Sequence, residues 1–366
     1  MSEGSVSDAP VLLAVDGNSL VHRSFHAQAS TGLRSATGRP MWAVRGLLLQ
    51  LTAAVERVGA TAVVVGFDDP EYSSRRERWP QYKAARIDKL DTLVDQLLLA
   101  AEVLAELGVA VVVPPGLEAD DVLASAARLA PTIGACTVVA TSDRDAFALI
   151  DDHTRVLRIL NGGVESSPLL TADRLELLTG IRPHQYRDFA ALRGDPSDCL
   201  PGVRGIGPKT AARLLAALGS ARAAFDDLDG DGAAVVAAVG PAAARALADP
   251  SARGTWELNC QVMTMRGDLA LALDLSRGPG VLPFAVDTVR RIFTGHQLTA
   301  SMTSGLRALA HHCTDSAPPP RYVSAATADG DRSHGTGHEH GTWTSDRPRP
   351  IRRPPARVAA QQLSLF

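Results

Sequence analysis

The chain has 366 residues, of which 45% are hydrophobic, 4% aromatic and 21% charged, and its formal net charge is −3. This length is sufficient for one sizeable α/β domain together with a smaller domain and a tail. The net charge does not indicate a nucleic-acid-binding protein, because most such domains are clearly basic. The distribution of charge along the chain therefore has to be considered instead.

The cysteines and the apolar segments exclude further classes of protein. The four cysteines, at positions 136, 199, 260 and 313, have no CxxC spacing, which argues against a zinc site and a disulfide framework. The N-terminus lacks a signal-peptide pattern, and no apolar run approaches the roughly 18 residues of a membrane span. We therefore expect a soluble cytoplasmic protein with no membrane partner.

Short runs of β-branched residues alternate with segments of helical periodicity in the first half of the chain. The expected strands are residues 11–16, 61–68, 109–113, 136–143 and 154–160. The expected crossover helices are residues 41–58 and 90–107. Apolar strands that alternate with helices form a parallel sheet covered on both faces. The predicted fold class of residues 11–170 is therefore α/β.

Beyond Leu170 the β pattern ends and short helical segments follow. Examples are TADRLELLTG at 171–180 and PKTAARLLAALG at 208–219, each closed by a glycine. We expect a helical domain over residues 171–313. Residues 314–360 are rich in Pro, Ser, Gly, His and Arg without apolar periodicity, which predicts a disordered linker. Residues 1–10 are expected to be a disordered N-terminus.

Carboxylate side chains gather where the expected strands end. They are Asp16 after the first strand, Asp68 after the second, Glu118, Asp120 and Asp121 after the third, and Asp143 and Asp145 after the fourth. The carboxyl ends of parallel strands share one edge of a sheet, so we expect these groups to face one crevice. A single Asp at such a position often only caps the next helix. A group of them requires cations, since like charges repel at short range, and oxygen ligands favour hard ions such as Mg²⁺ or Mn²⁺.

Five segments, in this order, resemble the signature segments of the bacterial 5′-3′ exonuclease and flap endonuclease family, which includes the 5′-nuclease domain of DNA polymerase I. They are LAVDGNSLVHRSFHA, GFDDPEYSSRRERWPQYKAARI, GLEADDVLA, TSDRDAFALI and LRGDPSDCLPGVRGIGPKTAARLL. The similarity runs over roughly residues 11–310 and implies a PIN-like nuclease core followed by a helical DNA-binding domain. Since no polymerase domain follows, the expected relative is the stand-alone form.

The resemblance implies that two divalent ions bind where the two domains meet. One ion would be held by Asp16, Asp68, Glu118 and Asp120, and the second would be surrounded, partly through water, by Asp121, Asp143, Asp145, Asp195 and Asp198. Two such ions can activate a water and stabilise the leaving oxygen of a phosphodiester without a protein nucleophile. Cys199 stands where the family usually carries Asn, and we expect this change to alter local hydrogen bonding rather than metal binding.

Basic and aromatic residues are concentrated in residues 70–90, which we call the gateway segment. Its composition suits contact with the phosphates and bases of a single strand, although a solvated charged loop has a similar composition. The resemblance implies that Lys83 and Arg86 act at the scissile phosphate, offsetting charge in the transition state, and that Tyr82 stacks near the cleavage site. The other expected DNA contacts are Arg75, Arg76 and, just after the first strand, Arg23.

Residues 202–215, GVRGIGPKTAARLL, place glycines between two short helices. Glycine lets the backbone approach a phosphate, and the N-terminal amides of the second helix favour an anion. The segment resembles the helix-three-turn-helix element of the family, which binds the duplex backbone without reading its sequence, often with a K⁺ ion. Its expected DNA contacts are Arg204, Gly205, Gly207, Lys209, Thr210 and Arg213.

An apolar peptide follows the polar linker, at Gln362, Leu363, Ser364, Leu365 and Phe366. An apolar peptide on a polar tether suggests a binding partner. This one, within residues 361–366, resembles the peptide by which bacterial replication proteins dock on the sliding clamp.

These features predict a structure-specific 5′ nuclease, monomeric and nucleoid-associated. Its substrates would be DNA with 5′ flaps, nicks or ends, and RNA primers, in Okazaki fragment processing and DNA repair. Two alternatives are a catalytically silent junction-binding protein tethered to the clamp, and a ribonuclease of the related acidic-site fold. The full set of nine carboxylates favours an enzyme over the silent protein. The glycine hairpin and the gateway segment favour DNA junctions over RNA.

Overall fold

The computed structural model describes residues 9–86 and 89–310, and its main sheet has the strand order β3-β2-β1-β4-β5-β6. The strands are β1 (Val11–Asp16), β2 (Ala62–Gly66), β3 (Ala110–Val112), β4 (Cys136–Thr141), β5 (Thr154–Arg158) and β6 (Leu169–Leu170). β1 to β5 pair in parallel, and β6 pairs antiparallel with β5. The predicted α/β class with a parallel sheet is confirmed, whereas the antiparallel edge strand was not predicted.

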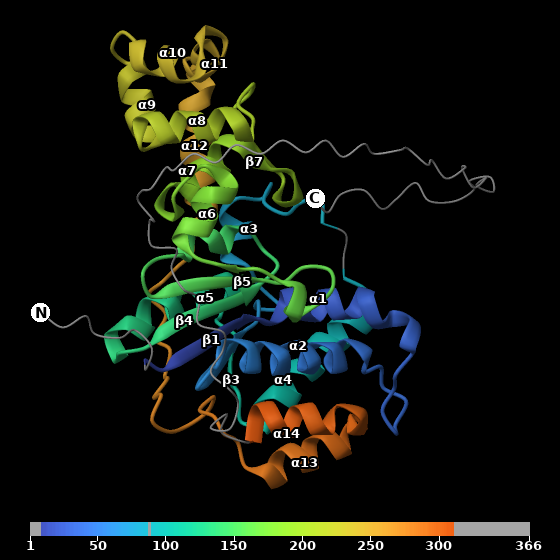
Figure 1. Cartoon of the computed structure of the whole chain (residues 1–366). Helices are drawn as coiled ribbons and strands as arrows, with labels where there is room; N and C mark the ends of the chain where they lie inside the picture. Colours follow the sequence, from blue (N-terminus) through green and yellow to red (C-terminus); the bar gives the residue numbers. More distant parts are fainter. Residues whose placement is uncertain (1–8, 87–88, 311–366) are drawn as a thin grey trace, which may run out of the picture. The chain divides into compact units, whose positions relative to one another are not determined.

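Helices cover both faces of this sheet (Figure 1). One layer contains α1 (Gly17–Gln28), α2 (Trp42–Val58) and α4 (Asp91–Leu107), and the other contains α5 (Ala119–Leu129). Successive residues of β1 face the two helical layers alternately. Leu13 and Val15 pack with the first layer, and Leu12 and Ala14 pack with the second. Because both faces of β1 are buried, its sequence is apolar without alternation.

A helical region follows the sheet and shares a core with the α5 layer. Its helices are α6 (Ala172–Thr179), α7 (Tyr186–Arg193), α8 (Pro208–Leu218), α9 (Ala221–Leu228), α10 (Ala233–Val239), α11 (Pro241–Leu247) and α12 (Pro250–Val262). A hairpin of β7 (Gly194–Asp195) and β8 (Leu200–Pro201) lies between α7 and α8. The rings of Phe147, which follows β4, and Tyr186 pack edge to face with centroids 5.2 Å apart, so one apolar core runs from the sheet into the helical region.

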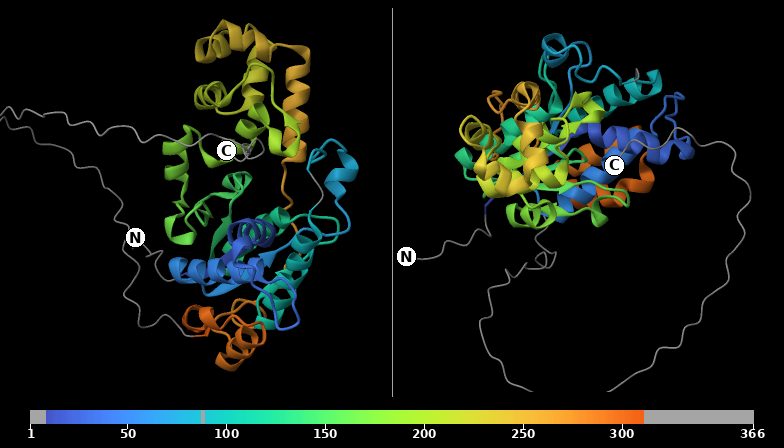
Figure 2. Two further views of the ribbon diagram at one scale, coloured as in Figure 1. Left: turned by 90° about the vertical axis from the view of Figure 1, so that its right-hand side faces the viewer. Right: turned by 90° about the horizontal axis from the view of Figure 1, so that it is seen from above.

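The end of the described chain returns to the α/β core, which differs from the predicted helical domain over residues 171–313. Two helices, α13 (Val286–Gly295) and α14 (Met302–Ala310), lie beside α2 and α4 (Figures 1 and 2). Val289, Phe293 and Leu309 are fully buried there in the core of the first helical layer. The strongly amphipathic pattern of both helices is satisfied by this layer and not by the helical region.

Part of the gateway segment forms a short helix, α3 (Ser74–Arg78). The expected linker at 314–360 and the peptide at 361–366 lie outside the described residues, so their predictions are not addressed by the structure. Over residues 9–86 and 89–310, no helix is long and apolar enough to cross a membrane.

Candidate active site

The predicted carboxylates lie along the carboxyl edge of the sheet. Along the chain, β2 pairs beside β1 and β3 beside β2, and β4 then pairs on the opposite side of β1. The reversal between β1 and β4 opens a crevice at their carboxyl ends, where ligands bind in sheets of this kind. Asp16 ends β1, and Asp143 follows β4 by two residues, so both carboxylates flank this switch point.

Asp16 is buried and hydrogen-bonded at the centre of this edge. Its Oδ1 accepts from the backbone amide of Ser19 at 2.8 Å and its Oδ2 from the hydroxyl of Thr141 at 2.7 Å. Burial raises the pKa of Asp16 to about 7, and the nearby charges of Asp68 and Asp143 add to the rise although the two hydrogen bonds oppose it. A carboxylate held in this way has a strong requirement for a proton or a cation.

Asp68 is oriented by Asn18, a residue that the sequence analysis missed. The amide Nδ2 of Asn18 donates to Asp68 Oδ2 at 2.7 Å, and the backbone amide of Asp68 donates back to Asn18 Oδ1 at 3.1 Å. The amide of Ala119, at the start of α5, donates to Asp68 Oδ1 at 3.0 Å. The segment DGNS contains both Asn18 and Ser19, and its polar residues next to Asp16 were the signal available in the sequence.

Two further carboxylates, Asp145 and Asp120, are affected both by burial and by the like charges gathered around them. Burial raises the pKa of Asp145 to about 8, with Asp143, Asp195 and Asp198 adding to the rise. Burial also raises the pKa of Asp120, and Asp143 and Asp16 increase it further. These carboxylates come from α5, from the segment after β4 and from the hairpin region, so distant parts of the sequence meet here.

The hairpin between α7 and α8 brings Asp195 and Asp198 to this edge. Gly194 has φ +78°, and a Cβ at this position would lie 2.2 Å from the backbone nitrogen of Gly202, so only glycine fits. Cys199 has φ 59°, a region in which Asn is favoured among residues with side chains, and its Sγ accepts from the amide of Ala85 at 3.3 Å.

Five of the predicted ligands line one small polar pocket. They are Glu118, Asp120, Asp143, Asp145 and Asp198. Within the described ranges, however, no three His, Cys, Asp or Glu side chains converge closely enough to hold an ion. Two of the five carboxylates, Glu118 and Asp198, are instead ion-paired with cationic side chains of the gateway segment.

Lys83 and Arg86 lie beside these five carboxylates, which together with Asp16, Asp68 and Asp195 we call the acid cluster. Lys83 Nζ is 2.7 Å from Glu118 Oε1, and Arg86 Nη2 is 2.6 Å from Asp198 Oδ1. The backbone amide of Lys83 also donates to the carbonyl of Asp198 at 2.9 Å. The gateway segment is thereby attached both to α5 and to the hairpin of the helical region.

Arg75 and Asp121 occupy positions that differ from their predicted roles. The guanidinium of Arg75 is buried, and it lies 2.6 Å from Glu118 Oε2 and 2.6 Å from Asp121 Oδ1. Asp121 is fully buried and also accepts from the amide of Arg266 at 2.7 Å. In this structure Arg75 and Asp121 pair with each other inside the protein, which differs from the predicted DNA contact of Arg75 and the predicted ion contact of Asp121.

Tyr82 also differs from its predicted role. Its ring is 5% exposed and packs with Leu200 and Val262, and its hydroxyl donates to Glu118 Oε2 at 3.1 Å. A ring buried in this way offers no face for a DNA base. Tyr82 instead fixes the gateway segment against the helical region, whereas Arg76 on the same segment is exposed.

We expect Arg75→Met to lower the free energy of unfolding of the metal-free protein by about 3–5 kcal/mol, because it leaves the buried Asp121 charge unpaired. The matched control is Arg76→Met in the same helix, where an exposed side chain is replaced and the expected change is within about 0.5 kcal/mol. Urea unfolding in the presence of a chelator measures both. Equal unfolding free energies for the two variants would contradict a structural role for the Arg75–Asp121 pair.

The predicted duplex contacts lie around the start of α8, in the helical region. Gly207 precedes the helix, Lys209 is exposed in its first turn, and Thr210 is half-buried. Arg204 and Arg213 are exposed, and Gly205 has φ +81°. Arg23 lies on α1, where its Nη2 donates to Asn161 Oδ1 at 3.0 Å.

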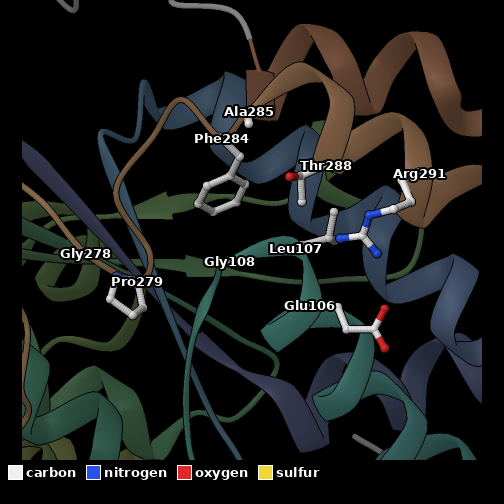
Figure 3. Close-up of a pocket in the computed structure, with 9 residues that line it drawn as sticks. All are labelled: Glu106, Leu107, Gly108, Gly278, Pro279, Phe284, Ala285, Thr288 and Arg291. Carbon is white, nitrogen blue, oxygen red and sulfur yellow. The ribbon is translucent and has the colours of Figure 1, made fainter.

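A larger cavity, of about 430 Å³, lies between the end of α4 and the start of α13 (Figure 3). Its lining includes Glu106, Gly108, Phe284, Thr288 and Arg291. Gly108 lies two residues before β3, so this cavity lies at the amino edge of the sheet, opposite the acid cluster. It has one carboxylate in its lining, and the acid cluster is therefore the candidate active site.

Two family models match consecutive parts of the chain. The first, described as 5'-3' exonuclease, N-terminal resolvase-like domain, matches residues 11–176, and the second, described as 5'-3' exonuclease, C-terminal SAM fold, matches residues 181–279. The chain belongs to the 5′-3′ exonuclease family. The second match ends before α13, in agreement with the return of residues 286–310 to the α/β core.

Relatives with curated names support the same family. DNA polymerase I of Mycobacterium tuberculosis is 39% identical over 220 residues, which are 60% of this chain and 24% of the relative. The thermostable DNA polymerase I of Thermus aquaticus is 36% identical over 280 residues, which are 76% of this chain and 30% of the relative. The aligned part of the chain thus spans less than a third of the length of these 5′-3′ exonuclease relatives.

Solved structures share the fold of this exonuclease. A structure titled as divalent metal ions (zinc) bound to T5 5'-exonuclease has a TM-score of 0.56 and 18% identity, covering 82% of this chain and 100% of its own. The catalytic core of Rad2 in complex with DNA substrate has a TM-score of 0.52 and 14% identity, covering 83% and 92%. At these identities the likeness shows the fold alone.

Proposed function

We propose that this chain is a metal-dependent 5′-3′ exonuclease and flap endonuclease that hydrolyses DNA phosphodiesters. The observation that carries the proposal is the polar pocket in which five carboxylates meet Arg75 and Tyr82, with Lys83 and Arg86 ion-paired to two of the carboxylates. The site combines carboxylates that can bind metal cations with basic side chains that can bind a phosphate. The alternative of a silent junction-binding protein lacks a reason for so many carboxylates at one edge.

The residues present fit divalent ions. The donors are carboxylate oxygens, which hard ions such as Mg²⁺ and Mn²⁺ prefer. Burial raises the pKa values of Asp16, Asp120 and Asp145, and the charges of neighbouring carboxylates add to the rise, so a bound cation would stabilise their ionised forms. Asp16, Asp68, Glu118 and Asp120 would hold one ion, and Asp143, Asp145, Asp195 and Asp198 the second. When bound, such ions supply activation of a water and stabilisation of the leaving oxygen.

Lys83 and Arg86 have a second role in this proposal. In the structure each neutralises a carboxylate, Glu118 or Asp198. When those carboxylates take other cationic partners, the ammonium and the guanidinium become free to donate to phosphate oxygens. Arginine and lysine so placed offset the negative charge that develops during phosphodiester hydrolysis.

The helical region would hold duplex DNA through its backbone. Arg204, Lys209 and Arg213 are exposed near the start of α8, and Gly205 and Gly207 allow a close approach of the main chain. Such contacts neutralise phosphates and do not select a sequence. A K⁺ ion beside the turn would add to this attraction. This chain shares its fold with the Rad2 catalytic core, which was solved in complex with a DNA substrate, and with T5 5'-exonuclease, which was solved with divalent zinc ions.

The deciding experiment is cleavage of a labelled double-flap DNA with Mg²⁺, with Mn²⁺ and with a chelator. We expect release of the 5′ flap near the junction that depends on the divalent ion. Tight binding without cleavage under either ion would favour the silent junction-binding protein. An RNA strand of the same structure, tested in parallel, separates this nuclease from a ribonuclease.

We also propose that the nuclease works as a nucleoid-associated monomer in Okazaki fragment processing and repair. A second proposal is that residues 362–366 bind the sliding clamp. Tethering raises the effective concentration of the enzyme at the replication fork. Deletion of residues 362–366 should abolish clamp pull-down and leave cleavage of free flap DNA unchanged. A shuffled five-residue end is the control, and pull-down by the deletion variant would reject this partner.

A further inference from the structure

Three arginines lie at the carboxyl edge of the sheet on the β5 side of the acid cluster. Arg158 ends β5, in register with Thr141, whose hydroxyl donates to Asp16. Arg144 follows β4 by three residues. Arg23 on α1 donates to Asn161, three residues beyond Arg158, so the helix is attached to the chain after β5.

None of these three arginines has a carboxylate within salt-bridge distance among residues 9–86 and 89–310. Arg75 and Arg86, on the other side of the same acid cluster, are both paired. The difference is not due to exposure, since Arg158 and Arg23 are half-buried.

Arg158 carries an unsatisfied buried donor. Its Nε has no hydrogen-bond partner, and its guanidinium lies over the ring of Phe147 at 5.8 Å from the centroid. Burial lowers the pKa of Arg158, and the positive charges of Arg144 and Arg23 lower it further. A buried donor without a partner destabilises the protein, so a bound acceptor would recover that loss.

We propose that Arg158, Arg144 and Arg23 form a phosphate-binding site for the substrate strand. The planar guanidinium group presents a fork of N–H donors that matches two oxygens of a phosphate. Three guanidinium groups without carboxylate partners therefore favour an anion that accepts hydrogen bonds from more than one of them. This inference rests on the proposed nuclease function and deepens it. The phosphate is either an internal phosphodiester next to the scissile one or a terminal 5′ phosphate.

The strand order defines where this phosphate lies along the substrate. Lys83 pairs with Glu118, which follows β3, at one end of the order β3-β2-β1-β4-β5-β6. Arg158 ends β5, which lies on the other side of β1 and β4, next to the antiparallel edge strand β6. The carboxylates that follow β1 and β4 lie between them. A strand that contacts Lys83 at one side would therefore reach the arginine cluster after crossing the carboxylates.

The test compares Arg158→Gln with Arg155→Gln, an exposed arginine three residues earlier on β5. Binding of double-flap DNA is measured by fluorescence anisotropy in chelator across a salt series, with 5′-phosphate and 5′-hydroxyl flaps. We expect Arg158→Gln to weaken binding by about tenfold. It should also reduce the slope of log K against log salt by about 0.7–0.9, the value for one phosphate contact. Arg155→Gln should match the unaltered protein.

A loss with both flaps identifies an internal phosphodiester, and a loss confined to the 5′-phosphate flap identifies the terminal phosphate. Arg158→Lys should restore the slope, and Arg144→Gln, at an exposed position, repeats the test if Arg158→Gln unfolds. If Arg158→Gln and Arg144→Gln both have the same salt slope as the unaltered protein, the proposed phosphate site is overturned. Cleavage by the unaltered protein would show in that case that the nuclease proposal stands. A reduced slope without metal-dependent cleavage would support the site and reject the nuclease.

Discussion

Asp145→Ala should reduce metal-dependent flap cleavage by about 10²–10³-fold, the scale observed when one preorganised electrostatic group is removed from an active site. Asp145 lies in the acid pocket, and its charge interacts with those of Asp143, Asp195 and Asp198. Its replacement removes an oxygen ligand proposed for the second ion. Asp143→Ala should have the same effect, because Asp143 lines the same pocket.

Junction binding by both variants should be retained or become tighter, since removal of a negative charge lowers the repulsion of phosphates. Single-turnover cleavage at saturating enzyme, together with the Kd for the same flap DNA in chelator, separates the two effects. Asp152→Ala is the matched control, because Asp152 is an exposed carboxylate beyond the pocket. Full cleavage by both pocket variants would refute the assignment of Asp143 and Asp145 to a metal ion.

The contribution of Asp16 and Asp145 to the stability of the metal-free protein should fall as the pH rises from about 4 to about 8. The pKa values of Asp16 and Asp145 are about 7 and about 8 in the folded state, against 3.8 in the unfolded chain. The folded state therefore binds more protons over this range. The stability that these protons contribute is fully present below pH 3.8 and is lost as the pH passes the two folded values.

Divalent ions should oppose this loss, because they replace the protons on the same carboxylates. At a hundred times its Kd, a ligand stabilises the folded state by about 2.7 kcal/mol, which raises the Tm of a protein of this size by about 3–5 °C. We expect the rise with Mg²⁺ to be larger at pH 8.5 than at pH 6. The measurement is the difference in Tm between samples with Mg²⁺ and samples with chelator at each pH. Groups that do not interact with the metal affect both samples equally and do not contribute to this difference.

Asp145→Ala provides the control for this second prediction. It should show a shallower decline of Tm with pH in chelator and a smaller rise with Mg²⁺. Asp152→Ala should follow the unaltered protein in both. Identical Tm profiles with and without Mg²⁺ across this pH range would mean that the acid cluster does not bind the ion in the folded protein.

Local sequence determined the strands and the position of the carboxylates. The runs VLLAVD, TAVVVGFD and CTVVATSD end in the acids that the structure places at the carboxyl edge. This was predictable because strands buried on both faces read as continuous apolar runs, and helices alternating with such runs indicate parallel pairing. The position of Lys83 and Arg86 beside those acids followed from the family resemblance and agrees with their ion pairs.

Long-range pairing was not predictable from local patterns. Arg75 lies in a basic segment, which suggests a DNA contact. In the structure, however, it is buried against Asp121, which lies 46 residues away in the sequence. Tyr82 has the appearance of a stacking ring, yet it fills a space between Leu200 and Val262. In both cases the charge or the ring is visible in the sequence, but its partner is set by how separate elements pack.

The sequence by itself thus determined the α/β class, the acidic edge and the exonuclease family. The tertiary structure alone decided which cations are already paired, which arginines lack an acid and where residues 286–310 belong. The physical reason is that hydrophobic periodicity and strand ends act over a few residues. The burial and pairing of a charge, in contrast, depend on side chains that folding brings together from distant segments.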